Sequence, residues 1–119
     1  MFNLNSIVIK DIKDRNLNFK KLLQKCDTFI WRDCENMEIK VNSKINKFEF
    51  NDCENIKIFL LGTIAGLEIN KCSNFTIILP KNHTISSLQL YKSVIKIDGK
   101  KIDFKKIILT NESSKIIFQ

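Results

Sequence analysis

Three near-copies of one five-residue segment run through the chain: Arg32-Asp33-Cys34-Glu35-Asn36, Asn51-Asp52-Cys53-Glu54-Asn55 and Asn70-Lys71-Cys72-Ser73-Asn74. The cysteines of these copies lie nineteen residues apart. A fixed period of this length is typical of chains that stack identical supersecondary units. The repeat therefore predicts a solenoid.

Apolar residues alternate with polar ones on both sides of each cysteine. In the second copy the alternating apolar residues are Phe48, Phe50, Cys53, Ile56, Ile58 and Leu60. A period of two indicates β-strands. A helical repeat needs about 33 residues or more, whereas roughly 20 residues rich in Ile, Phe and Val suit one coil of a β-solenoid. We therefore predict an all-β fold, a β-helix with two strands in each coil of about 19–21 residues.

The cysteines Cys34, Cys53 and Cys72 are expected to form a buried column, because equivalent residues of successive coils lie about 4.8 Å apart. Three thiols in register could also bind a metal or take part in redox chemistry. Structural zinc sites use close pairs such as C-x2-C, and these cysteines are not spaced in that way. We therefore interpret the column as small buried apolar residues of the core.

A second column is expected at the bend that follows each cysteine, where Asn36, Asn55 and Asn74 recur. Asparagine tolerates the left-handed backbone conformation, and its side chain can bond to its neighbours along a stack. Both columns are therefore interpreted as structural.

A single domain over residues 1–119 follows from the repeat. Residues 6–26 are expected to form an irregular opening coil, because terminal repeats are commonly atypical. Residues 27–97 form the regular coils, and residues 98–119 form a carboxy-terminal β-hairpin extension.

The extension is predicted from its turn signals. Asp98-Gly99 is typical of a two-residue hairpin turn between residues 94–97 and 101–104. Residues 105–110 and 115–118 are expected to form a further hairpin. The open strand edges at this end favour pairing with a second copy of the chain, so we expect a homodimer.

The net charge is +7 and comes almost entirely from lysine. Most aromatic residues fall at inward positions, where they cannot stack on bases, so nucleic-acid binding is not expected. No apolar run reaches the roughly 20 residues of a membrane span, and the amino terminus does not resemble a signal peptide. We expect a cytoplasmic protein with reduced cysteines and no membrane partner.

Enzymatic activity is not expected from this sequence. His83 is the only histidine, and it lies in a lengthened turn without a repeated acid or nucleophile beside it. The glycines are scattered rather than gathered in a phosphate-binding loop. We predict no cofactor and no metal.

The segment from Cys34 to Cys53, and more broadly residues 29–97, resembles the carboxy-terminal domain of cyclase-associated proteins, the C-CAP domain of the cofactor-C-like superfamily. That family repeats an apolar strand, a Cys or Asn-Cys corner, a second strand and a Gly-Lys-Ile-Asn-Ser-like bend, and Ser43-Lys44-Ile45-Asn46 stands at this bend here. The resemblance implies a right-handed β-helix and dimerisation through the carboxy-terminal strands. It also implies a cytoskeletal protein that binds actin monomers, to sequester them or to promote nucleotide exchange.

The outward positions of the second strands indicate a surface for a protein partner, because Phe59 and Ile78 would be contiguous and rimmed by lysines. The alternative is that the terminal segments fold back over these two residues. The partner-binding residues that we predict are Lys40, Lys44, Lys47, Lys57, Phe59 and Ile78. Actin binding leaves one alternative function, a self-associating structural or scaffold solenoid that does not bind actin.

Overall fold

A computed structural model describes residues 4–19, 26–41, 45–60, 64–79, 83–99 and 102–119. Every element that it describes is a β-strand: β1 Leu4–Lys10, β2 Lys13–Phe19, β3 Cys26–Arg32, β4 Glu35–Val41, β5 Ile45–Asn51, β6 Glu54–Leu60, β7 Ile64–Asn70, β8 Ser73–Leu79, β9 His83–Tyr91, β10 Val94–Gly99, β11 Ile102–Thr110 and β12 Lys115–Phe118. The prediction of an all-β fold is confirmed.

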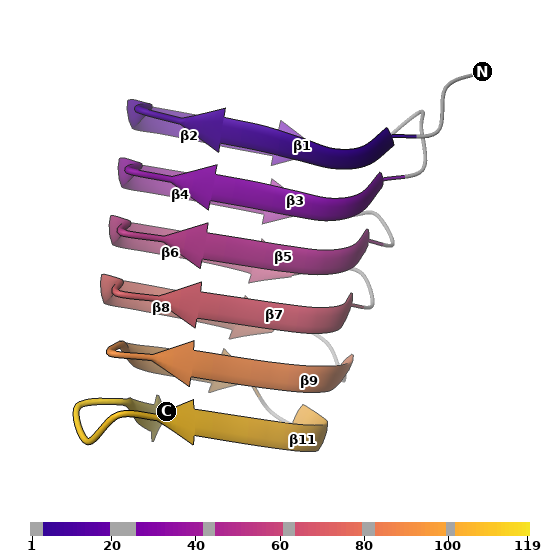
Figure 1. The fold of residues 1–119 in the computed structure, drawn as a ribbon, viewed down its shortest axis with the longest axis vertical. Helices are drawn as coiled ribbons and strands as arrows, with labels where there is room; N and C mark the ends of the chain where they lie inside the picture. The colour runs from indigo at the N-terminus through magenta and orange to yellow at the C-terminus, as the bar shows by residue number, and fades with distance from the viewer. Residues whose placement is uncertain (1–3, 20–25, 42–44, 61–63, 80–82, 100–101) are drawn as a thin grey trace.

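The strands form two parallel sheets, and each odd-numbered strand makes one coil with the even-numbered strand that follows it. One sheet has the order β1-β3-β5-β7-β9-β11, and the other has the order β12-β10-β8-β6-β4-β2. Viewed from the amino-terminal end, the chain turns clockwise as it moves away, so the solenoid is right-handed (Figure 1). The register follows the repeat, because residues nineteen positions apart pair with each other. Phe29 pairs with Phe48, and Phe48 pairs with Leu67.

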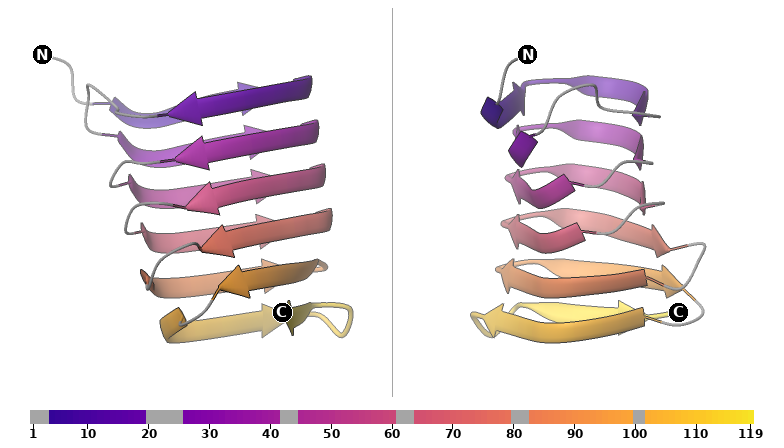
Figure 2. Two further views of the ribbon diagram at one scale, coloured as in Figure 1. Left: turned by 180° about the vertical axis from the view of Figure 1, so that it is seen from behind. Right: turned by 90° about the vertical axis from the view of Figure 1, so that its right-hand side faces the viewer.

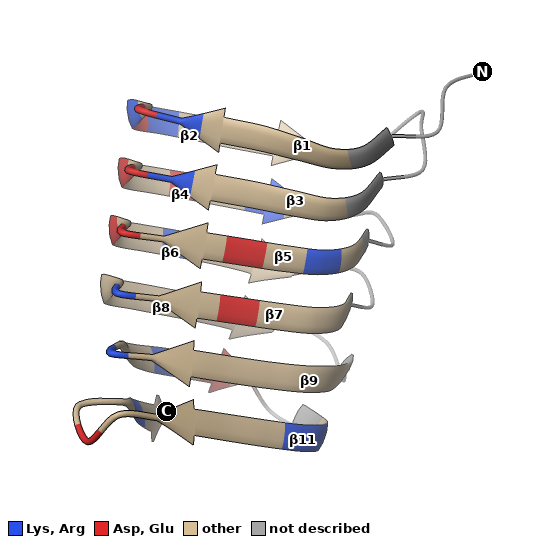
Figure 3. Ribbon diagram, in the orientation of Figure 1, with Lys and Arg blue, Asp and Glu red and all other residues tan. Residues whose placement is uncertain are grey.

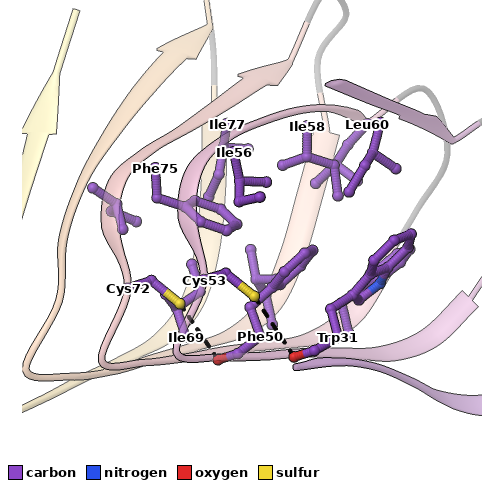
Figure 4. Close-up of a cluster of buried hydrophobic side chains, with 14 of the residues drawn as sticks. Trp31, Phe50, Cys53, Ile56, Ile58, Leu60, Ile69, Cys72, Phe75 and Ile77 are labelled. Carbon is purple, nitrogen blue, oxygen red and sulfur yellow. Dashed lines mark hydrogen bonds between the residues drawn. The ribbon is translucent and has the colours of Figure 1, made fainter. Parts of the chain in front are cut away.

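The core lies between the two sheets and is built from the inward residues of every strand. Phe29, Trp31, Phe48 and Phe50 form a stacked aromatic group, and the ring of Phe75 meets Phe50 edge-on with centroids 4.9 Å apart. Figure 4 shows how the side chains of both sheets fill this interior. Burying one such side chain stabilises the fold by about 1.5–3 kcal/mol. The burial of the alternating apolar side chains is therefore the main source of stability.

The thiol column is buried, as predicted: Cys34, Cys53 and Cys72 are each at most 3% exposed. Each thiol points along the stack. Cys53 Sγ lies 3.4 Å from the carbonyl oxygen of Asn51 in its own coil. It lies 3.8 Å from the carbonyl oxygen of Trp31 in the preceding coil, as Figure 4 shows. Burial raises the pKa of Cys34, and the contact with the Cys72 thiol together with burial raises the pKa of Cys53. Buried thiols that contact backbone carbonyl oxygens fit the structural interpretation of the column.

The asparagine column also forms as predicted. Asn74 Nδ2 donates to Asn55 Oδ1 at 2.8 Å, and Asn55 Nδ2 donates to Asn36 Oδ1 at 2.8 Å. The ladder begins one coil earlier than the sequence repeat, because Asn36 Nδ2 donates to Asp14 Oδ1 at 2.6 Å. All four residues have positive φ, between 50° and 55°, a conformation that Asn and Asp adopt more readily than other non-glycine residues.

The predicted carboxy-terminal hairpins are wrong. β11 pairs in parallel with β9, and β12 pairs in parallel with β10, so residues 102–119 add a further coil. Asp98 and Gly99 belong to β10, where they pair with Ile78 and Leu79. A type I′ hairpin turn needs positive φ at both central residues, and Gly99 does not have it. The expected irregularity of the opening coil is also wrong for the described strands, because β1 and β2 pair in register with β3 and β4.

Candidate functional site

The outer surface of the even-numbered sheet carries a face that we call the lysine–apolar face, made of Lys40, Lys57, Phe59 and Ile78. Lys40 on β4 pairs with Phe59 on β6, which pairs with Ile78 on β8. Phe59 and Ile78 are half-buried, and Lys40 and Lys57 are exposed. Lys40 Nζ lies 5.5 Å from the centre of the Phe59 ring, a cation–π contact worth about 0.5–1 kcal/mol at an exposed site.

No described element covers this face. Every described strand belongs to one of the two sheets, and the left view of Figure 2 shows the even-numbered strands with no described strand across them. The alternative in which terminal segments fold over Phe59 and Ile78 is therefore wrong for the described residues.

A shallow polar groove borders the lysine–apolar face on the side of the asparagine ladder. Its volume is about 300 Å³, and its lining residues are Asp14, Asn16, Asn36, Met37, Glu38, Asn55 and Lys57. A second depression of about 170 Å³ is lined by Lys40 together with Asn16, Leu17, Asn18 and Glu38. Lys57 and Lys40 thus each line one of these two hollows.

One of the predicted lysines, Lys47, does not join this face, and the position of another is not described. Lys44 lies outside the described residues. Lys47 lies on β5 in the opposite sheet, where its Nζ is 2.7 Å from Glu68 Oε2. This ion pair raises the pKa of Lys47, and Figure 3 shows acidic residues on β5 and β7 next to that lysine. The outer surface of the odd-numbered sheet therefore places a lysine beside acidic residues, unlike the lysine–apolar face.

The sequence interpretation missed a second exposed apolar surface, which we call the C-terminal end. Ile107 is 41% exposed, Leu109 49% and Phe118 60%. These residues continue the inward columns, because their partners in the preceding coil are the buried residues Leu88, Leu90 and Ile97. They are exposed because no described strand pairs with the outer edges of β11 and β12. The alternation over residues 104–118 could have revealed this arrangement.

Comparison with known families agrees with this architecture. The family model described as adenylate cyclase associated (CAP) C terminal matches residues 5–118. The chain belongs to this family. The search of curated proteins and the search of solved structures found no match. The family match covers both end coils of the CAP C-terminal domain, including β11 and β12, and so extends beyond the resemblance over residues 29–97.

No group of three or more metal-ligating side chains occurs among the residues that the structure describes. The side chain of His83 lies outside the described residues. Within the described part of the chain there is also no helix with the length and hydropathy to cross a membrane.

Proposed function

We propose that this CAP C-terminal domain is a non-enzymatic regulator of the cytoskeleton that binds actin monomers through the lysine–apolar face, to sequester them or to promote their nucleotide exchange. The observation that carries the proposal is the family match over residues 5–118. The face supports it, because two half-buried apolar side chains flanked by exposed lysines have the composition of a protein-binding surface.

Charge gives the proposal a kinetic component. The net charge of +7 would speed encounter with an acidic partner surface, and the gain would fall with added salt. The apolar pair Phe59 and Ile78 would supply the contact area that slows dissociation, while Lys40 and Lys57 orient the partner. Affinity and association rate should therefore respond differently to substitutions in the two parts of the face.

The double variant Lys40→Glu/Lys57→Glu tests the proposal in an actin polymerisation assay. The unaltered domain should slow polymerisation of monomeric actin, and the double variant should weaken binding at least tenfold, about 1.4 kcal/mol. The matched control Lys10→Glu/Lys71→Glu makes the same charge change at exposed lysines away from the face and should retain binding. The release rate of a fluorescent nucleotide from actin distinguishes sequestration from exchange. Unchanged polymerisation at saturating protein contradicts actin binding, and an equal loss in both double variants contradicts the assigned face.

We also propose that the domain forms a homodimer through its C-terminal end. The open edges of β11 and β12 can each accept another strand, and the exposed residues Ile107, Leu109 and Phe118 would be buried by a second copy. A two-fold axis perpendicular to the solenoid axis makes the edge strands of the two copies antiparallel, so the pair is closed. Analytical ultracentrifugation should show a dimer that Leu109→Lys dissociates.

The exposed apolar residues of the C-terminal end also favour the second candidate function, a structural or scaffold solenoid that only self-associates. That function predicts dimers or larger assemblies together with no effect on actin polymerisation, so the two assays together separate the candidates.

A further inference from the structure

The two ends of the solenoid differ in one core column. Arg15 on β2 pairs with Met37 on β4, and the column continues through four more apolar residues: Ile56, Phe75, Ile95 and Ile116. The backbone before Arg15 has the same shape as in the next coil, because Asp14 has φ 55° and Asn36 has φ 54°. Arg15 therefore stands at an inward position, and because no described strand precedes the first coil it is exposed.

The neighbours of Arg15 in the first coil are apolar. Ile7, Ile9 and Leu17 occupy the inward positions above Phe29, Trp31 and Ile39 and pack against the core. The amino-terminal end therefore presents the inward side chains of the core, with the guanidinium group of Arg15 among them. The C-terminal end presents the same inward positions, but Ile116 stands at the one that corresponds to Arg15.

In a parallel solenoid the lower side of one coil fits the upper side of the next. Two copies could therefore stack head to tail, with the first coil of one beneath β11 and β12 of the other, and the parallel pairing of β10 with β12 would simply continue. Such a contact does not close, and repeated contacts build an open filament. Most of the inward residues at the two ends are compatible with this stacking.

Arg15 opposes it. In a head-to-tail stack the Arg15 guanidinium would be placed against Ile116 of the neighbouring copy, inside an apolar core with no carboxylate in its column. Burying a cation without a partner is strongly unfavourable. Polar outer faces on terminal repeats keep solenoids from associating in this way.

We propose that Arg15 blocks head-to-tail stacking of this chain and so restricts self-association to the C-terminal end. The closed two-fold pair rests on the dimerisation proposed above, whereas the block itself concerns only the contact between unlike ends. What Arg15 excludes is the head-to-tail contact with a second copy of the same chain.

The test compares Arg15→Leu with Arg15→Lys, which keeps the charge, by sedimentation velocity over a hundredfold range of concentration. Arg15→Leu should give assemblies larger than a dimer that grow with concentration and appear as filaments in electron micrographs, while Arg15→Lys should match the unaltered chain. Arg15→Gln, which removes the charge but would leave an amide without a partner in the apolar column, should assemble beyond the dimer less readily than Arg15→Leu. Adding Leu109→Lys to Arg15→Leu should abolish the filaments, which separates stacking from non-specific aggregation.

The block is overturned if Arg15→Leu and Arg15→Gln keep the size of the unaltered chain, if Arg15→Lys polymerises equally, or if the unaltered chain already forms filaments. A monomeric unaltered chain whose Arg15→Leu variant polymerises would contradict the dimer and support the block. A dimeric unaltered chain whose two neutral variants stay dimeric would contradict the block and support the dimer.

Discussion

Replacing Cys53 by alanine and by serine separates packing from hydrogen bonding in the thiol column. Cys53 is 1% exposed, and its Sγ contacts the carbonyl oxygens of Asn51 and Trp31. The chain contains its own reference for the serine variant, because Ser93 occupies the equivalent corner two coils later. There the hydroxyl oxygen is buried and accepts a hydrogen bond from the backbone N–H of Cys72 at 3.0 Å.

The size of the effect depends on the atoms that each variant removes. Cys53→Ala deletes one buried sulfur, comparable to a methylene group, at a transfer cost of about 0.8 kcal/mol. The cavity of roughly 20–25 Å³ adds about 0.5 kcal/mol. The total of about 1.3 kcal/mol should lower Tm by roughly 4–8 °C for a chain of this size. Cys53→Ser leaves no such cavity and keeps a donor for the same carbonyl groups, so it should cost about half as much.

Urea unfolding followed by circular dichroism at pH 7, with a reductant present, measures both values. The reverse substitution Ser93→Cys should change the free energy of unfolding by less than about 1 kcal/mol, because the column already holds thiols at equivalent corners. A serine variant that is less stable than the alanine variant would refute the view that this column tolerates a hydroxyl group. An alanine variant as stable as the unaltered chain would refute the packing role.

Three other predictions concern the ladder, the odd-numbered sheet and the core. Asn55→Ala should destabilise the fold by about 1–2 kcal/mol, because alanine is disfavoured at a φ of 55°; Asn55→Gly should recover part of the loss in thermal unfolding, and equal losses would contradict a conformational cause. Glu68→Gln should cost at most about 0.5 kcal/mol. The ion pair raises the folded-state pKa of Lys47, so this stabilisation is present below pH 10.5 and is lost as pH rises through the raised value; a difference that persists in stability measurements at pH 12 would contradict the ion pair as its source. Phe50→Ala removes a fully buried ring and should cost about 3–5 kcal/mol, and a midpoint of urea unfolding close to that of the unaltered chain would contradict the assigned core.

The period of nineteen residues predicted the solenoid because one number determines the strands, the register and the columns together. Once Cys34, Cys53 and Cys72 are placed in one column, every residue between them has a defined neighbour in the next coil. Alternation then assigns Phe48 and Phe50 to the interior, as the structure confirms. The same alternation made Lys47 and Lys57 outward. Lys47 precedes a cysteine and Lys57 comes after it, so the turn at Cys53 places them on opposite sheets, and their grouping into one site overlooked this turn.

The two ends of the chain were harder to predict because exposure there depends on whether another coil packs against the last one. Leu109 and Phe118 obey the same alternation as the buried core, and they are exposed only because β11 and β12 have no later neighbours among the described strands. The dipeptide Asp98-Gly99 favours a hairpin turn locally, yet a hairpin would have left the backbone groups of β8 without the partners that β10 supplies along its edge. The repeated pairing of parallel strands therefore outweighs a two-residue turn preference, and it carries the solenoid on through β11 and β12. An array that grows in this way has no internal stop, so the residues that limit it must lie in its first and last coils, where Arg15 and the exposed apolar residues of β11 and β12 are found.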